Sequence, residues 1–266
     1  MTAPQPGEWL DRFDEPGQTF EQYVASDPVR PTEDRSVLAF LPCGPFSEEE
    51  REIALAAVEF AGLWFELPVR VLPDHELPRN RWQRTSEHRL GGGEFTQYRT
   101  DWFLDWLLPS RRPNDAVCLT AVTMGDLYPS ADWNFVFGMG SFKRRVAVYS
   151  LARFYESFHG REDTPDSRKR ALRRAAGLVT HELGHCFGLR HCIYYRCNMN
   201  GSNSLGESDR QPLRLCPVCL RKLEWNRGFD PIRRYRGLLN FYEEHELSEE
   251  AAWVRNRLIF LGSREF

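Results

Sequence analysis

Apolar and polar positions along the chain predict strands and helices that alternate. The apolar run at 36–41 is typical of a buried strand. The S-E-E-E sequence at Ser47 is typical of a helix start, and apolar residues at helical spacing follow it. A second strand is expected at 64–72. Because a helix separates these two strands, the pattern predicts a parallel crossover.

The middle of the chain predicts a mixed sheet. Residues 73–95 carry many charges and three consecutive glycines, and we expect a mobile loop there. The next element expected is a helix at 95–108, whose core face would consist of Tyr98, Phe103, Leu104 and Leu107. A strand at 115–122 and two antiparallel strands at 133–142 and 146–154 are expected to follow. Strands that alternate with helices in this way predict an α/β fold, in which a mixed, mostly parallel, twisted sheet has one antiparallel edge strand.

A long helix is expected to be capped by Asp166 or Ser167 and to continue through His181. Its core face would consist of Leu172, Ala175, Ala176, Val179 and Leu183. Further helices are expected to begin near Pro217 and Pro231, and Ser248 is expected to cap a last helix.

The strongest chemical signal is the string H-E-x-x-H-x-x-G-x-x-H, which runs from His181 to His191. On a helix His181 and His185 share one face and can bind one metal ion, and Glu182 can reach a water on that metal. Gly188 can take the left-handed conformation that ends a helix, after which His191 can supply a third imidazole. Three protein ligands with one open position are typical of catalytic zinc. The alternative is a buried helix whose histidines are satisfied core residues.

Five of the seven cysteines lie within 186–219. Four of them form two closely spaced pairs, Cys192 with Cys197 and Cys216 with Cys219. Two such pairs on loops are typical of a tetrahedral structural zinc site, which would fold the segment 192–219. A redox pair, a disulfide or free thiols are the alternatives. The remaining cysteines are expected to be buried thiols: Cys43, Cys118 and Cys186.

Charge and the N-terminal stretch narrow the possible partners. The balance of 35 Lys+Arg against 38 Asp+Glu gives a net charge of −3, which does not favour nucleic acid or a membrane surface. Because no signal-like or membrane-length apolar run is present, we expect a cytoplasmic protein. We also expect a monomer. Residues 1–35 are expected to be an N-terminal extension that docks through its aromatic residues Trp9, Phe13, Phe20 and Tyr23.

The motifs resemble those of the metzincin clan of zinc proteases, and within it the archaemetzincins. The resemblance lies in the histidine string, in Cys192 directly after His191, in Cys197-Asn198-Met199 and in the Cys216-x-x-Cys219 pair. It implies a zincin fold in residues 36–266, with a sheet and active-site helix in 36–188 and a helical C-terminal subdomain in 189–266. Met199 would be the methionine turn beneath the histidines.

The same resemblance implies two Zn²⁺ per chain and a peptide or protein substrate. The activity would be peptide hydrolysis, aminopeptidase-like and narrow in specificity, with Glu182 as general base. Tyr149, Tyr194 and Tyr195 are candidates for oxyanion stabilisation, with core packing as the alternative. The rival functions are a catalytically weak or inactive, zinc-stabilised interaction module and a nucleic-acid binder that uses the cysteine knuckle; the acidic balance argues against the latter.

Overall fold

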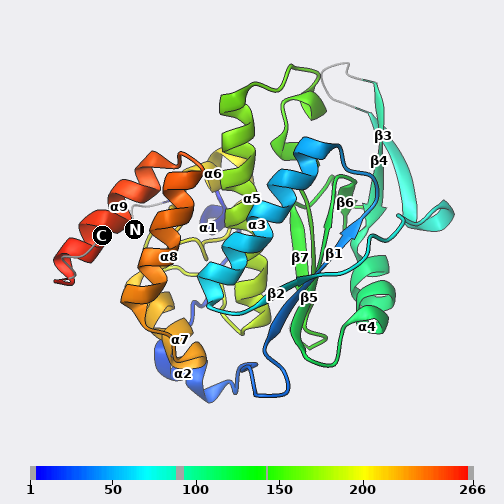
Figure 1. The fold of residues 1–266 in the computed structure, drawn as a ribbon. Coiled ribbons are helices and arrows are strands. Elements are labelled where there is room, and N and C mark those ends of the chain that lie inside the picture. Colours follow the sequence, from blue (N-terminus) through cyan, green and yellow to red (C-terminus); the bar gives the residue numbers. More distant parts are fainter. Residues whose placement is uncertain (1–3, 88–92, 142, 263–266) are drawn as a thin grey trace. The chain divides into compact units, whose positions relative to one another are not determined.

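The computed structural model describes residues 4–87, 93–141 and 143–262 (Figure 1). The chain divides into two compact units. The first, here called the sheet unit, comprises Pro31–Gly62 and Leu67–Cys186. The second, here called the helical unit, comprises Met1–Arg30, Leu63–Glu66 and Phe187–Phe266.

The sheet unit is built on a five-stranded sheet with the order β2-β1-β5-β8-β7. Its strands are β1 (Val37–Cys43), β2 (Val69–Val71), β5 (Ala116–Thr123), β7 (Gly138–Ser141) and β8 (Val146–Ser150). The pairings β1–β2, β1–β5 and β5–β8 are parallel, whereas β7 pairs antiparallel with β8. The structure therefore confirms the predicted mixed sheet with one antiparallel edge strand.

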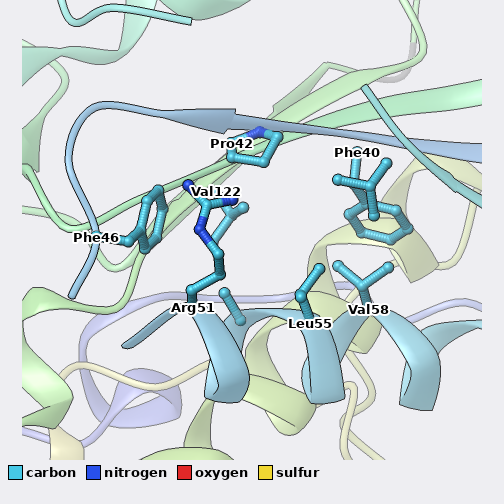
Figure 2. Close-up of a pocket in the computed structure, with 9 residues that line it drawn as sticks. Phe40, Pro42, Phe46, Arg51, Leu55, Val58 and Val122 are labelled. Carbon is cyan, nitrogen blue, oxygen red and sulfur yellow. The ribbon is translucent and has the colours of Figure 1, made fainter. Parts of the chain in front are cut away.

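Two long helices, α3 (Glu48–Phe65) and α5 (Pro165–Cys186), pack on one face of this sheet (Figure 1). The capping sequence predicted at Ser47 is present, because Ser47 N donates to Glu50 Oε2 at 2.7 Å and Glu50 N donates to Ser47 Oγ at 3.3 Å. Figure 2 shows a small apolar pocket where Leu55 and Val58 of α3 face Phe40 of β1. The helix thus covers the central strands with its apolar side.

The opposite face of the sheet is covered by a π-helix at Trp102–Leu107 and by α4 (Leu108–Arg111). Phe103, Leu104 and Leu107 are buried against alternate side chains of the sheet strands, as the pattern predicted. The predicted helix at 95–108 is nevertheless wrong at its beginning, because residues there form a strand. Tyr98, which we had expected on the core face of that helix, lies on this strand.

A second sheet has the order β3-β4-β6, with β3 (Gln83–Glu87), β4 (Glu94–Arg99) and β6 (Asp126–Tyr128). The mobile loop predicted at 73–95 is therefore wrong over 83–87 and at 94–95. Every second residue of β3 is exposed and its other side chains are polar or charged, so the strand lacks the apolar alternation that marks a buried one. Of the predicted glycine turn, residues 91 and 92 lie outside the described residues, and Gly93 has a φ of +85°.

Other predicted boundaries shift by a few residues. The strand expected at 64–72 is limited to β2, because α3 continues through Phe65. Trp64 and Phe65 are buried, and a short buried apolar run does not distinguish helix from strand. The strands expected at 133–142 and 146–154 shrink to β7 and β8, and two short 3₁₀ helices follow at Ala152–Phe154 and Ser157–His159.

The helical unit contains α1 (Trp9–Arg12), α2 (Phe20–Ala25), α6 (Leu205–Asp209), α7 (Pro217–Arg227), α8 (Pro231–Glu244) and α9 (Ser248–Phe260). The helix starts predicted at Pro217 and Pro231 are confirmed, and the side chain of Asp230 caps α8 by accepting from Ile232 N at 2.9 Å. For α9 the N-cap residue is Leu247, so the cap predicted at Ser248 is off by one residue.

The N-terminal segment packs within the helical unit, as its aromatic residues suggested. Tyr23 is fully buried; its hydroxyl donates to Phe187 O at 2.9 Å and accepts from Asn226 Nδ2 at 2.8 Å. The buried ammonium group of Lys222 donates to the backbone and side-chain oxygens of Gln18. Two stretches far apart in the sequence therefore share one core.

Candidate functional site

The helix α5 brings His181, Glu182 and His185 together in the sheet unit. It begins at Pro165, and Thr164 rather than Asp166 or Ser167 is its N-cap: Ser167 N donates to Thr164 Oγ1 at 3.2 Å, and Thr164 N donates to Ser167 Oγ at 2.8 Å. Proline at the first helical position needs no hydrogen-bond acceptor, so Pro165 suits this position. The N-cap lies two or three residues before the predicted one.

The two histidines of α5 are arranged as a pair of metal ligands. They lie one helical turn apart, and the Nε2 atoms of His181 and His185 are 3.1 Å from each other. Two nitrogens bound tetrahedrally to zinc at about 2.0–2.1 Å would be about 3.3 Å apart. The observed spacing therefore fits a shared zinc ion.

Glu182 is buried beside the edge strand β7. A Cβ atom added at Gly138 would lie 3.1 Å from Glu182 Cγ and 3.2 Å from Cδ, and one added at Gly140 would lie 3.5 Å from Oε2. The two glycines thus leave the space that the carboxyl group occupies. Burial raises the pKa of Glu182 to about 8, because a low-dielectric surrounding disfavours its charge. A cation bound by the neighbouring histidines would favour the ionised form.

The residues that follow α5 belong to the helical unit. Gly188, two residues after the helix ends, has a φ of +84°, a conformation that side chains other than glycine rarely adopt. A Cβ atom at this position would also lie 2.8 Å from Pro28 Cβ. Gln18 Nε2 donates to Gly188 O at 3.1 Å, so the N-terminal segment supports this turn. The imidazole of His191 has its Nδ1 atom 2.7 Å from Glu15 Oε1.

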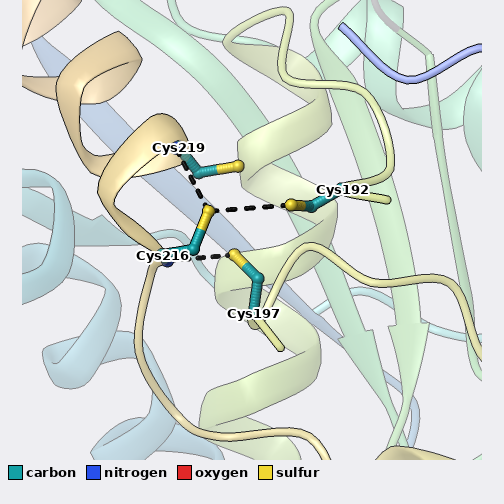
Figure 3. Close-up of side chains that lie close together, drawn as sticks. All are labelled: Cys192, Cys197, Cys216 and Cys219. Atoms are coloured by element: carbon teal, nitrogen blue, oxygen red, sulfur yellow. Dashed lines mark hydrogen bonds between the residues drawn. The ribbon is translucent and has the colours of Figure 1, made fainter. Parts of the chain in front are cut away.

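The four predicted cysteine ligands form one cluster in the helical unit (Figure 3). Their sulfur atoms all lie within 4.8 Å of one another, and all four residues are buried. Cys192 Sγ and Cys216 Sγ are 3.6 Å apart. Tetrahedral zinc–thiolate bonds of about 2.3 Å would place two sulfurs about 3.8 Å apart. The cluster therefore has the donor set and the spacing of a closed zinc site.

Backbone groups position the cluster. Cys216 is the N-cap of α7, and its sulfur accepts from Cys219 N at 3.4 Å, while Cys216 N donates to Cys197 Sγ at 3.2 Å. Such N–H groups stabilise thiolate charge. On α7 one turn after Cys219, burial lowers the pKa of Lys222, and the four cysteine sulfurs oppose this shift. Met199 is fully buried, and its carbonyl accepts from Cys192 N at 2.7 Å.

The remaining candidates have different environments. Tyr149 is fully buried in β8, whereas Tyr195 is half-exposed. The other cysteines, Cys43, Cys118 and Cys186, are buried thiols, as predicted. Sequence reasoning singled out neither Glu15 nor Gly140, although glycine at alternate positions of a predicted strand was a possible signal. No helix in the described part of the chain is long and apolar enough to cross a membrane.

Comparison with protein families and curated proteins finds similarity over most of the chain. The model of "Peptidase family M54" matches residues 112–225. The chain is 31% identical to archaemetzincin-2 of Macaca fascicularis over 277 aligned positions, covering 92% of this chain and 74% of that protein. It is also 30% identical to archaemetzincin-2 of Homo sapiens, with the same coverage.

Solved structures show the same likeness. The crystal structure of archaemetzincin from Methanopyrus kandleri superposes with a TM-score of 0.55 and 28% identity, covering 74% of this chain and 97% of that chain. Archaemetzincin from Archaeoglobus fulgidus, solved with malonate, gives a TM-score of 0.52 and 26% identity over 70% of this chain and 99% of that chain.

Proposed function

Because the chain belongs to the archaemetzincin family of zinc metallopeptidases, we propose that it hydrolyses peptide bonds with Glu182 as general base and with a zinc ion on His181, His185 and His191. The observation that carries the proposal is the arrangement on α5. There the Nε2 atoms of two histidines converge to 3.1 Å, next to a buried carboxyl group. The spacing of the histidine string supports His191 as the third ligand.

The chemistry follows from the groups at hand. A zinc ion held by His181, His185 and His191 would supply a Lewis acid and would lower the pKa of the attacking water. Glu182 accepts the proton of the attacking water and then donates it to the leaving amine. Burial of Glu182 beside β7 restricts its carboxyl group to one region, which reduces the reorganisation needed for proton transfer. The role of Tyr149, Tyr194 or Tyr195 as an oxyanion donor stays a prediction.

The edge strand β7 is the element that we assign to substrate binding. It is the last strand of the five-stranded sheet, and it lies next to Glu182. An extended peptide can add to such an edge through main-chain hydrogen bonds, which would place a scissile bond near the carboxyl group. The family resemblance supports a narrow, aminopeptidase-like specificity. Mapping the cleavage sites in a peptide mixture tests this point, because an aminopeptidase releases only N-terminal residues.

We assign a second, structural zinc ion to Cys192, Cys197, Cys216 and Cys219. With four thiolates no ligand position remains open, so this ion would stabilise the fold rather than take part in hydrolysis. Metal analysis of the purified protein should then give two zinc ions per chain. A value of one would remove one of the two sites from the proposal.

The decisive experiment for the enzymatic role is the substitution Glu182→Gln. The amide is nearly isosteric but cannot accept the proton, so turnover should fall by about 10²–10⁴-fold while both zinc ions are retained. The exposed residue Glu162 provides the control, because Glu162→Gln should leave turnover unchanged. If Glu182→Gln turns over peptides as fast as the wild type, the general-base role is refuted. If the wild type shows no cleavage that a chelator can inhibit, the inactive interaction module is favoured.

A further inference from the structure

We propose that Glu15, in the N-terminal segment, is a positioning residue of the histidine zinc site. Its carboxylate holds the imidazole of His191 through Nδ1, which leaves Nε2 as the nitrogen that binds the metal. The proposal rests on the function proposed above, because it requires His191 to be a zinc ligand. It assigns a role in metal binding to an N-terminal segment that the family motifs do not include.

The contact between Glu15 and His191 is short and partly shielded from water. Glu15 Oε1 lies 2.7 Å from His191 Nδ1, and the two side chains are 22% and 19% exposed. An ionised carboxylate can only accept hydrogen bonds, so Nδ1 carries the proton and donates it. The lone pair of the neutral ring is then on Nε2. This tautomer is the one that a metal bound through Nε2 requires.

The carboxylate is itself held in place. Trp9 Nε1 donates to the same Glu15 Oε1 at 2.8 Å, and the ring of Trp9 packs edge-on against the ring of His191, with centroids 5.0 Å apart. Glu15 therefore connects Trp9 to the imidazole in one chain of hydrogen bonds. Because the indole also packs against His191, the segment constrains both the tautomer and the plane of the ring.

The segment around Trp9 is fixed to the loop and helix that follow the first cysteine pair. Trp9 N donates to Glu207 Oε1 at 2.9 Å, and Asn203 Nδ2 donates to Gly7 O at 3.3 Å. Gly201 lets the indole approach, because a Cβ atom there would lie 2.5 Å from Trp9 Cδ1. The partners in these contacts lie far from Glu15 in the sequence. The contacts hold the carboxylate of Glu15 in position before a metal ion binds.

The chemistry of metal sites gives this arrangement a defined consequence. A carboxylate that accepts a hydrogen bond from a ligating histidine orients the ring and raises the basicity of the nitrogen that binds the metal. Loss of such a partner typically lowers metal affinity by about 10- to 100-fold. The effect should be strongest at the histidine site, because Glu15 contacts the imidazole of His191 directly.

The test compares Glu15→Ala, Glu15→Gln and the control Glu8→Gln in the full-length, zinc-loaded protein. Glu8 lies on the same segment but pairs with Arg210 rather than with His191, so Glu8→Gln removes a carboxylate of this segment and leaves the contact between Glu15 and His191 in place. Titration with a chelator measures the affinity of each zinc ion. Glu15→Ala should weaken one ion by about 10- to 100-fold and leave the other unchanged. Glu15→Gln, whose amide oxygen still accepts from Nδ1, should weaken it less, and Glu8→Gln should match the wild type.

A spectroscopic readout separates positioning from a general loss of structure. In the zinc-loaded wild type the Nδ1 proton of His191 should give a downfield, slowly exchanging NMR resonance, which Glu15→Ala should abolish and Glu8→Gln should retain. Unchanged zinc affinity in Glu15→Ala overturns the inference. Increased peptide turnover by Glu15→Ala also overturns it, because Glu15 would then inhibit the histidine site rather than position its ligand. If the wild type binds only the ion held by the cysteines, the proposed function fails as well. If the wild type binds two ions and Glu15→Ala binds both with the same affinities as the wild type, only the role of Glu15 is refuted.

Discussion

Adding one methyl group at Gly138 should disturb the carboxyl group of Glu182 directly. A Cβ atom there would lie 3.1 Å from Val148 O and 3.1 Å from Glu182 Cγ. Both distances are shorter than ordinary van der Waals contacts. The Val148 oxygen belongs to the backbone of β8 and cannot move aside, so the side chain of Glu182 has to shift by a few tenths of an ångström.

The size of the effect follows from this overlap. Overpacking of this kind costs about 1–3 kcal/mol, while replacing glycine by alanine returns about 0.4–1 kcal/mol through the entropy of the unfolded chain. We therefore expect Gly138→Ala to lower the free energy of unfolding by about 0.5–2 kcal/mol. A displacement of about 1 Å costs roughly 10²-fold in rate, so this smaller shift should lower kcat by about 10-fold.

Gly140 provides a matched control on the same strand and face. A Cβ atom there would meet Glu182 Oε2 at 3.5 Å, Glu182 O at 3.6 Å and Ala147 Cβ at 3.8 Å, which are ordinary contacts. Gly140→Ala should therefore keep kcat within about twofold of the wild type and be neutral or slightly stabilising. Peptide-cleavage kinetics and urea unfolding measure both effects. If the two variants lose the same activity, or if Gly138→Ala keeps full kcat, the steric argument is wrong.

Three further substitutions test other parts of the structure. Cys216→Ser should remove one zinc ion per chain, as metal analysis would show, while leaving the zinc of the histidine site in place. Gly188→Ala should lower the free energy of unfolding in urea by about 1–3 kcal/mol, because it adds a contact with Pro28 to a strained φ. Gly160 has a φ of +73°, and an added Cβ would have no non-neighbouring atom of the described residues within 4 Å, so Gly160→Ala should cost less. An equal cost in the two variants would exclude a contribution from the Pro28 contact. Tyr23→Phe should lower the free energy of unfolding by about 1–3 kcal/mol, because Phe187 O and Asn226 Nδ2 lose their hydrogen bonds to the hydroxyl group. Tyr155→Phe should be nearly neutral, because the buried hydroxyl of Tyr155 has no hydrogen-bond partner in the described residues. Thermal unfolding that ranks the two tyrosine variants in the opposite order would contradict this reasoning.

The main sheet and helix α5 could be predicted because their signals are local and repeat. β5 begins with an uninterrupted apolar run at 116–119, and the apolar residues of α5 recur at helical spacing. The second sheet could not be predicted, because β3 is largely exposed and polar and gains its order by pairing with β4. The boundary of α3 was missed for another reason: Trp64 and Phe65 are buried in a helix where their pattern suited a strand equally well.

The candidate site likewise has a part that the sequence predicted and a part that only the tertiary structure shows. The sequence by itself singled out the side chains proposed to carry the metal chemistry, because histidines of one helix, or the members of a short cysteine pair, are brought together by local geometry. Only the tertiary structure decided what surrounds them: two glycines of β7 beside Glu182, and Glu15 against His191 across 176 positions of the chain. Such partners carry no mark in the sequence, because a carboxylate or a glycine acquires its role only when folding brings a distant group within contact distance.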